Sequence, residues 1–339
     1  MSGRALRWLM SLAHRRADAG TARLTIIRHH RVYRDGERPL YRLGVRESVL
    51  RDQLELLQQL GLTPLGVAEG VRRLDEGRAG HWVALSFDDG YADNVRAALP
   101  LLAARGACAT FYLTAGLMET RRAPWWDVLA HALERSSGDR LEWSAGGRTY
   151  DLSLHDLRAR VRALAALIPS LRVVPAEQAE RLGSLRSALG VSDPASCELA
   201  TWAESEALVA AGMEVGAHTM SHPFLSLLPG SEQDAEIRGS MDLIQRRLGV
   251  RVQGLAYPGG DYDAVSLDVA RLAGLAYAAS TRAGDNAIDQ PRHELLRRGL
   301  PEGACLGPGG RFSRHLTTAE LDGAFDRLRA GAAAAEAAA

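Results

Sequence analysis

Two adjacent carboxylates, Asp88 and Asp89, are the first residues whose types and spacing could do chemistry. They end an apolar run at 81–87 and precede Gly90, which lets the chain turn at once. An Asp-Asp-Gly sequence alone is typical of a tight turn. A functional interpretation requires two roles, with one carboxylate bound to a metal and the other left free as a base. Because Gly90 permits a sharp turn, both side chains could reach the same pocket.

His218 and His222 form a second pair, four residues apart. On a helical turn this spacing points both imidazoles the same way, which suits two ligands of one metal ion. The same spacing also occurs on solvated helices. Here, however, an apolar segment at 213–217 precedes the pair and Pro223 follows it directly. A solvated helix would not be interrupted in this way, so we interpret the pair as metal ligands on a helical turn.

Asp89 and the two histidines make a set of one carboxylate and two imidazoles, with positions left open for water and substrate. Zinc accepts such a set in catalytic sites, and non-haem iron accepts it in oxygenases. Asp88 favours hydrolysis, because a free carboxylate beside a metal-bound water can act as a base. An oxygenase has no obvious use for this second carboxylate.

Five segments resemble motifs of the polysaccharide deacetylases, carbohydrate esterase family four. Three resemble the motifs that carry the chemistry, and two are similar to flanking motifs of the poly-N-acetylglucosamine deacetylase-like branch. Several motifs in the family's order argue against chance agreement. The resemblance covers about 24–118 and 200–302 and leaves out the long middle segment. In chain order the segments are 24–32 (LTIIRHHRV), 86–90 (SFDDG), 218–222 (HTMSH), 257–260 (YPGG) and 295–300 (LLRRGL).

The resemblance implies a metal site and a base, assigned position by position. Asp89, His218 and His222 would bind one divalent cation, with Zn²⁺ the expected ion. Asp88 would be the general base that takes a proton from the metal-bound water.

The resemblance also implies roles for three further positions. The backbone N–H of Gly259, together with the ion, would hold the oxyanion of the tetrahedral intermediate. His30 would be the general acid that protonates the departing sugar amine, with the adjacent His29 as the alternative. Arg297 is similar to an arginine that orients the base.

Four positions depart from the family's pattern, and they concern substrate preference more than the metal centre. Ala256 stands where the third motif often begins with Arg. Gly259 replaces a common aromatic residue, which could open the sugar site. Arg28 and His29 replace a usual apolar residue and a usual Tyr, respectively.

Ring-bearing side chains are the candidates for substrate contacts, since the apolar faces of sugars pack well on aromatic rings. We predict such contacts for Trp125 and Trp126, and for Tyr257 and His29 within the motifs. Core packing is the more frequent fate of a tryptophan and stays the alternative for the first two.

Strands and helices alternate along the sequence, which is typical of an α/β fold with a parallel sheet. The polar residues above directly follow expected strands, and the carboxyl ends of parallel strands meet at one edge, where sites assemble. The resemblance implies a distorted parallel (β/α) barrel. We expect strands at 24–27, 81–87, 107–113, 213–217, 253–257 and 276–281, and helices at 47–60, from about 92 with a second segment at Pro100, and at 231–248.

The regular alternation breaks at about 119–199, which we interpret as a mostly helical insertion with a Gly-rich turn at 146–147. Helix starts of the capping-box type are expected at 201–204 and, for the terminal helix, at 317–320. The chain thus divides into three parts, which are an N-terminal helical extension at 1–23, a deacetylase-type domain at 24–316, and a C-terminal helix with an Ala-rich tail at 317–339.

Composition and the N-terminus limit the partners. Lys plus Arg and Asp plus Glu both number 41, which argues against a nucleic-acid binder. Three widely separated cysteines argue against a disulfide framework and fit a reducing compartment. The sequence contains no run of about 18 apolar residues, which is the length that a membrane span needs. The N-terminus is a poor match to a signal peptide. We therefore expect a cytoplasmic location. The N-terminus could form an amphipathic helix at the inner membrane surface, or a terminal helix packed on the domain. Its apolar residues, set among basic ones, are Leu6, Leu9, Met10 and Leu12, with Trp8.

The sequence predicts a metal-dependent hydrolase that removes N-acetyl groups from the amino sugars of a glycan or a lipid-linked saccharide. An amidase or deformylase acting on a non-polymeric or non-sugar amide is the first alternative, because the barrel and its metal do not fix the leaving group. A catalytically silent metal- or glycan-binding module is the second. Asp88 argues against this second alternative, since binding alone needs no free base.

Overall fold

Seven parallel strands form one curled sheet in the computed structural model, which describes residues 3–14, 16 and 20–326. The strands lie in the order β10-β9-β8-β5-β4-β1-β11, and each neighbouring pair is parallel. Their bounds are β1 Ala22–His29, β4 Gly80–Phe87, β5 Thr110–Leu113, β8 Glu214–Ala217, β9 Gly254–Ala256, β10 Tyr277–Ala279 and β11 Arg298–Gly299.

An irregular segment before β11 joins the two ends of the sheet. Ala279 of β10 forms a parallel bridge with Leu295, and the N–H of Ser280 donates to the carbonyl of Leu295 at 2.8 Å. Directly after this segment, β11 pairs with β1. The sheet therefore closes into a distorted parallel (β/α) barrel, and the predicted fold is confirmed.

β4 illustrates why the apolar runs of the sequence become central strands. Val83, Leu85 and Phe87 belong to the large core beneath the outer helices, whereas Ala84 faces the barrel interior with Tyr112. Because successive residues of a strand point to opposite faces, a strand buried on both sides needs a continuous apolar run. This explains the buried run at the end of β4.

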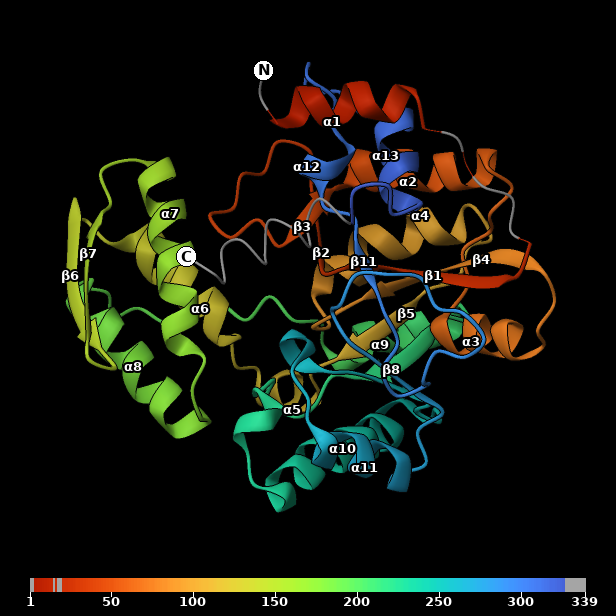
Figure 1. Cartoon of the computed structure of the whole chain (residues 1–339). Helices are drawn as coiled ribbons and strands as arrows, with labels where there is room; N and C mark the ends of the chain where they lie inside the picture. Colours follow the sequence, from red (N-terminus) through yellow and green to blue (C-terminus); the bar gives the residue numbers. More distant parts are fainter. Residues whose placement is uncertain (1–2, 15, 17–19, 327–339) are drawn as a thin grey trace.

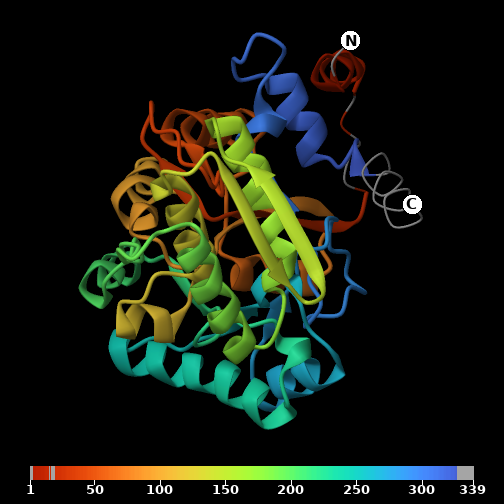
Figure 2. The ribbon, with the colours of Figure 1, turned by 90° about the vertical axis from the view of Figure 1, so that its left-hand side faces the viewer.

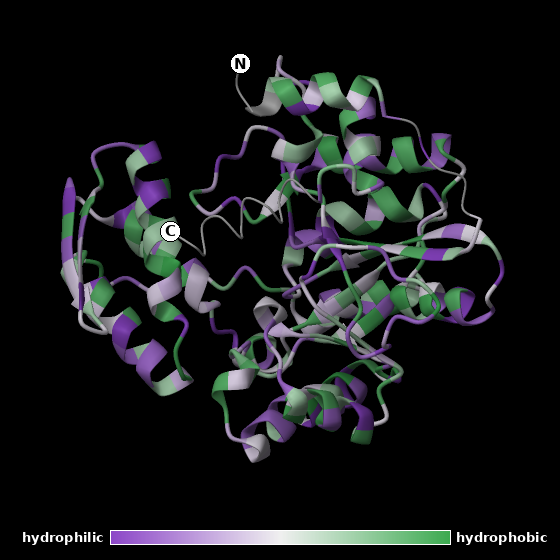
Figure 3. Ribbon diagram, in the orientation of Figure 1, coloured by the Kyte–Doolittle hydropathy of each residue, from purple (hydrophilic) through white to green (hydrophobic). Residues whose placement is uncertain are grey.

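Helices cover the outside of the barrel (Figure 1). In α2, Leu50, Leu54 and Leu57 fall on one buried face, as their spacing predicts. Figure 3 shows hydrophobic and hydrophilic residues mixed along the helices, as expected for amphipathic elements. The helices of the barrel region are α2 Glu47–Gln59, α3 Val67–Asp75, η1 Asn94–Ala98, α4 Leu99–Ala103, α5 Ala115–Thr120, α9 Trp202–Ala210, η3 Leu225–Leu227, α10 Gly230–Leu248, η4 Pro258–Gly260, α11 Ala264–Leu272 and α12 Glu302–Cys305.

The helix ends test the predicted caps. The capping box of Thr201 and Glu204 is present at the start of α9, as predicted. The prediction for the terminal helix is wrong, because α13 (Arg314–Leu321) begins three residues before the expected cap. Ser313 caps it by accepting a hydrogen bond from Leu316 N, and Thr317 lies buried inside the helix. The Ala-rich tail lies outside the described residues.

The insertion forms a separate layer opposite the C-terminal ends of the strands (Figures 1 and 2). It has its own apolar core, which includes Leu129, Leu133 and Leu141. The predicted turn at 146–147 is the tip of an antiparallel hairpin. The sequence analysis did not predict the two strands of this hairpin. Its elements are α6 Trp125–Arg135, β6 Arg140–Ala145, β7 Arg148–Ser153, α7 Leu157–Leu167, η2 Ile168–Leu171 and α8 Pro175–Ala188.

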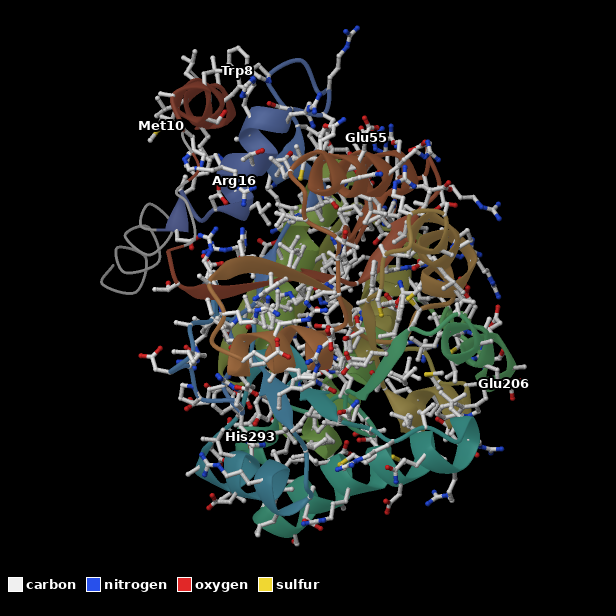
Figure 4. The ribbon with its side chains drawn as sticks, turned by 90° about the vertical axis from the view of Figure 1, so that its right-hand side faces the viewer. Trp8, Met10, Arg16, Glu55, Glu206 and His293 are labelled. Atoms are coloured by element: carbon white, nitrogen blue, oxygen red, sulfur yellow. The ribbon has the colours of Figure 1, made fainter. Side chains whose placement is uncertain are left out.

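The N-terminal helix α1 (Gly3–Leu12) packs on α13 through one side. Trp8 contacts the cluster of Leu316, Ala319 and Phe325, and Arg7 pairs with Glu320 at 3.2 Å. Figure 4 views α1 nearly end-on and shows Met10 on the side away from the body of the molecule. Within the described part of the chain, no helix is long and apolar enough to cross a membrane.

Candidate active site

One carboxylate and two imidazoles meet at the C-terminal edge of the sheet. Asp89 follows β4, and His218 follows β8. Asp89 Oδ1 lies 3.4 Å from Nε2 of His218 and 3.7 Å from Nε2 of His222. The three candidate ligand atoms all lie within 4.8 Å of one another. The structure thus brings together the three residues that the sequence predicts as metal ligands.

The spacing of these atoms fits a shared cation better than a hydrogen-bonded cluster. Distances of 3.4 and 3.7 Å are long for N–H···O hydrogen bonds. Ligands about 2.0–2.2 Å from a tetrahedral zinc ion would lie roughly 3.4 Å apart. The His218 ring donates its Nδ1 hydrogen to Ala256 O at 2.7 Å, which leaves Nε2 as the ligand atom. The donor set therefore fits a divalent cation.

The charge states of Asp89 and His222 also suit a cation. Burial would raise the pKa of Asp89, but contact with His218 and the nearby His30 hold this pKa below its ordinary value. Burial and the neighbouring His218 lower the pKa of His222 to about 3. The carboxylate is therefore ionised and the His222 ring is neutral at neutral pH, which are the forms that bind metals.

The histidine pair is carried by a loop, so the predicted helical turn is wrong. Thr219 and His222 have left-handed backbones, with φ of 64° and 59°. Thr219 Oγ1 accepts a hydrogen bond from His222 N at 3.1 Å. Glu236 of α10 holds the loop by accepting from the N–H groups of Met220 and Ser221. Left-handed conformations of non-glycine residues are costly and occur mainly where a site requires them.

Asp88 lies beside the metal cluster and is held by Arg297. Both carboxylate oxygens accept from this guanidinium, at 2.6 and 2.9 Å. Arg297 is fully buried and also donates to Ser280 O through Nε at 2.8 Å. Burial alone would raise the pKa of Asp88, but the charge of Arg297 brings it well below its usual range. Asp88 is therefore an oriented, ionised carboxylate outside the ligand set.

His30 follows β1 directly and lines the same cavity as Asp88. Its Nε2 is 3.9 Å from Asp88 Oδ2. Asn94 fixes its backbone by donating from Nδ2 to His30 O at 2.7 Å. Asn94 begins the π-helical segment η1, a kind of irregularity that often accompanies functional sites. The sequence analysis did not identify this supporting residue.

Gly259 lies in the 3₁₀ turn η4 and has a left-handed φ of 60°. The first N–H groups of such a turn have no partner within it, so the Gly259 N–H is available to a ligand. A Cβ at this position would lie 3.2 Å from the ring of Phe224, which is a tight contact. Glycine thus fits this position both by its left-handed backbone and by leaving room for Phe224.

The three candidate ligands, Asp88, His30 and Gly259 all line one cavity of about 390 Å³. The insertion supplies part of its wall, so the barrel and the insertion together form the site. Its wall also contains residues that the sequence analysis did not assign to the site. The lining consists of Arg28, His30, Tyr41, Leu43, Asp88, Asp89, Trp125, Trp126, Ile168, His218, His222, Phe224, Gly259 and Thr281.

The two tryptophans occupy different positions in this wall. Trp126 is 4% exposed, its ring meets the edge of His222 at 4.4 Å, and its Nε1 donates to Tyr91 Oη. Trp126 therefore supports a metal ligand. Trp125 is more exposed and lies 6.4 Å from Phe224 between ring centroids, so these two rings form the more accessible aromatic part of the wall.

Comparison with family models gives a result that agrees with this geometry. A model described as Polysaccharide deacetylase matches residues 76–278, which is more than half of the chain. The chain belongs to the polysaccharide deacetylase family. The matched region contains Asp88 and the three candidate ligands, whereas His30 and Arg297 lie outside it.

Solved structures share the fold of this polysaccharide deacetylase at low sequence identity. The Streptococcus pyogenes deacetylase PplD, in complex with acetate, has a TM-score of 0.57 and 20% identity, over 85% of this chain and 96% of that one. BC0361, a polysaccharide deacetylase from Bacillus cereus, has a TM-score of 0.55 and 15% identity, over 89% of this chain and 69% of that one. IcaB from Ammonifex degensii has a TM-score of 0.54 and 18% identity, over 91% of this chain and 100% of that one. Comparison with curated proteins found no match.

Two predicted substrate contacts of this polysaccharide deacetylase lie away from the cavity. His29 points to the opposite face of β1, where it stacks on Phe87 at 5.4 Å and packs among apolar side chains beneath α2. Tyr257 is fully buried, stacks on Tyr262 and donates to His293 O at 3.1 Å. Both side chains are therefore structural, and His29 cannot replace His30 as the acid.

Asp127 is a partly buried carboxyl near the site that should make stability depend on pH. It accepts a hydrogen bond from Tyr91 at 2.9 Å, and burial raises its pKa to about 6. The folded state thus favours the protonated form, so its contribution to stability is present below pH 4 and lost as pH rises through 6. In Asp127→Asn the amide can still accept from Tyr91 without ionising. We expect denaturant unfolding to show this variant about 2–3 kcal/mol more stable at pH 8 and equal at pH 4. A difference independent of pH would contradict this assignment.

Proposed function

We propose that this chain is a metal-dependent hydrolase that removes N-acetyl groups from the amino sugars of a glycan or a lipid-linked saccharide. One observation carries the proposal. One cavity contains a complete set of metal ligands, a separate ionised carboxylate and a histidine. Metal-assisted amide hydrolysis needs these three components, as ligands, base and acid. Membership of the polysaccharide deacetylase family supports the choice of an acyl amino sugar.

The residues of the cavity divide the work of hydrolysis. A divalent cation held by the three ligands, with Zn²⁺ the ion we propose, would acidify water and polarise the amide carbonyl. Asp88 accepts a proton from the attacking water, and Arg297 keeps the carboxylate ionised and oriented. The Gly259 N–H donates to the developing oxyanion. His30 donates a proton to the departing nitrogen, so the products are acetate and a free amine.

Acetate release tests this proposal directly. The protein should release acetate from N-acetylglucosamine oligomers after loading with zinc, and chelation should stop the release. Simple amides such as N-acetylated alkylamines should react far more slowly. Equal rates on both classes would replace the sugar assignment by a general amidase, and release unaffected by chelation would exclude the metal.

His30 gives a separate prediction. Replacing it by Ala should lower kcat about 100- to 10,000-fold, because the amine would depart without a proton donor. Metal content should stay unchanged, since His30 is not among the three ligands. Elemental analysis and acetate assays on the same preparation check both statements. His29→Ala serves as a control for the site, because its side chain points the other way. An unaltered kcat in His30→Ala would assign the acid role to another group.

We also propose that α1 rests on a membrane surface. Leu6, Leu9 and Met10 are about half exposed and basic residues flank them in sequence, which suits an anionic bilayer. Changing all three to Gln should weaken sedimentation with phosphatidylglycerol vesicles at least about tenfold, given the apolar area lost. Leu272→Gln, at an even more exposed apolar residue elsewhere, should have no effect. Equal sedimentation of all proteins would contradict a role for α1.

A further inference from the structure

Arg28 is a cation in the cavity wall that the proposed chemistry does not use. It lies next to the end of β1, in register with Ser86 of β4 and Gly299 of β11. Arg28 and His30 are two residues apart, so their side chains fall on the same face of the chain, and both line the cavity. An arginine is unexpected here, because the resemblance places an apolar residue at this position.

The guanidinium of Arg28 has no anionic partner. Among the residues that the structure describes, it forms no ion pair and no hydrogen bond, and its Nε is buried without a partner. A Cβ at Gly299 would lie 3.6 Å from its Nη2, so this glycine leaves the guanidinium uncovered on that side. The donors of Arg28 are therefore free to bind a ligand.

The two carboxylates of the cavity already have other partners. Both oxygens of Asp88 are bound by Arg297, and Asp89 belongs to the metal cluster. Burial and the nearby charge of Arg297 lower the pKa of Arg28, and the attraction of Asp88 and Asp89 offsets this lowering only in part. A charge in this position is costly unless something outside the protein compensates it.

The charge of the cavity also favours an anion. Two carboxylates, at Asp88 and Asp89, balance the two guanidiniums of Arg28 and Arg297, so the formal sum is zero. A divalent cation would bring the sum to plus two. An N-acetyl amino sugar by itself is neutral and does nothing to reduce this excess, whereas an acidic substrate does.

We propose that Arg28 binds an anionic group of the substrate, so that the N-acetylated sugar carries, or is linked to, a phosphate or a carboxylate. This inference rests on the proposed function and names its substrate class. A guanidinium fork matches the paired oxygens of either anion. Tyr41, in the same wall, offers a second donor, because burial raises its pKa to about 12 and so keeps its hydroxyl protonated.

The first test compares kcat/KM on acidic and neutral substrates. The acidic ones are N-acetylglucosamine 1-phosphate and a disaccharide of N-acetylglucosamine and glucuronate, and the neutral one is methyl N-acetylglucosaminide. The zinc-loaded protein should prefer one acidic substrate at least about tenfold. In Arg28→Met the acidic-to-neutral ratio should fall about tenfold or more, with Arg28→Lys intermediate. The substrate that shows the fall identifies the anion as phosphate or carboxylate.

Arg172→Met is the matched control for these substitutions. Arg172 lies 5.1 Å from the ring centroid of Phe224, which lines the cavity, but its guanidinium is already paired with Asp261. Its loss removes the same charge from the neighbourhood without removing free donors, so the ratio should stay that of the wild type. An equal fall in both variants would indicate a general field effect and overturn the assignment to Arg28.

A second test needs no turnover. Glucose 1-phosphate, methyl glucuronide and methyl glucoside lack an acetyl group, so their binding to the zinc-loaded protein can be measured by calorimetry. Arg28→Met should weaken binding of one acidic ligand at least about tenfold, and should melt no lower than the wild type because an unpaired charge is removed. Affinities that do not change in Arg28→Met overturn the proposal, even where the phosphate binds.

The two tests separate this inference from the proposed function. Acetate release at an acidic-to-neutral ratio that is the same in the wild type and Arg28→Met would refute the anion site and leave the deacetylase function in place. Arg28-dependent binding of an acidic ligand without acetate release from any substrate would do the reverse.

Discussion

Asp88→Asn should keep its metal and lose turnover, whereas Asp89→Asn should lose the metal itself. This difference is expected although the residues are neighbours. Asp89 shares the ligand cluster with two imidazoles, and Asp88 faces Arg297. Without its base the enzyme should lose about 100- to 10,000-fold in kcat. Without its carboxylate ligand the site keeps only two imidazoles, which hold a divalent cation poorly. Elemental analysis after gel filtration and acetate release on the same samples measure both effects.

The control for these variants is Asp268→Asn, which makes the same chemical change at an exposed residue of α11. It should leave metal content and turnover unchanged. Thermal melting of the metal-free proteins shows whether either site variant is simply unfolded. Equal metal content together with equal activity in Asp88→Asn and Asp89→Asn would contradict the division of roles.

The second large effect concerns stability. Arg297→Met should lower the free energy of unfolding by about 3–5 kcal/mol, because it leaves the buried carboxylate of Asp88 without its counter-charge. It also removes the donor to Ser280 O. Denaturant unfolding in the presence of a chelator measures this effect without a contribution from metal binding. The free energy of unfolding of Arg297→Lys should lie between those of the wild type and Arg297→Met, since an ammonium supplies the charge but not the two parallel hydrogen bonds.

A double-mutant cycle distinguishes this ion pair from general damage to the core. In Asp88→Asn/Arg297→Met no charge is left unpaired, so the double variant should be less destabilised than the sum of the two single variants, by about 2 kcal/mol or more. Strictly additive losses would mean that the two side chains contribute independently.

The metal ligands and the base could be predicted because each follows a strand of a parallel sheet. The apolar runs before Asp88 and His218 predict β4 and β8, and parallel strands end at a common edge. The motif spacing then limits which side chains meet there. Their local conformation was less predictable. The spacing of His218 and His222 is helical, but left-handed backbones at Thr219 and His222 bring the rings together in a loop.

The error at His29 has a simple physical origin. Arg28 and His30 must share one face of the chain and His29 the other, but β1 is buried on both faces, so its apolar pattern does not show which face meets the cavity. Tyr257 was misplaced for the same reason.

The other residues of the cavity wall could be identified only from the tertiary structure. Tyr41 comes from a loop and Ile168 from the insertion, both far in the sequence from the metal ligands, and Phe224 comes from the loop that follows His222. No periodic pattern indicates such contacts. Arg28 stood out in the sequence as a departure from the family's pattern. Its lack of a partner became visible when the structure showed Asp88 fully engaged by Arg297.

Anomalous X-ray diffraction at the zinc edge, from crystals grown with zinc, is the most direct test of the proposed centre. We predict one peak in the cavity, about 2.0–2.2 Å from a side-chain atom of each of Asp89, His218 and His222. Asp88 should lie outside the coordination sphere and remain paired with Arg297. A cavity without a peak, or a peak bound by Asp88 in place of Asp89, would contradict the proposed metal centre.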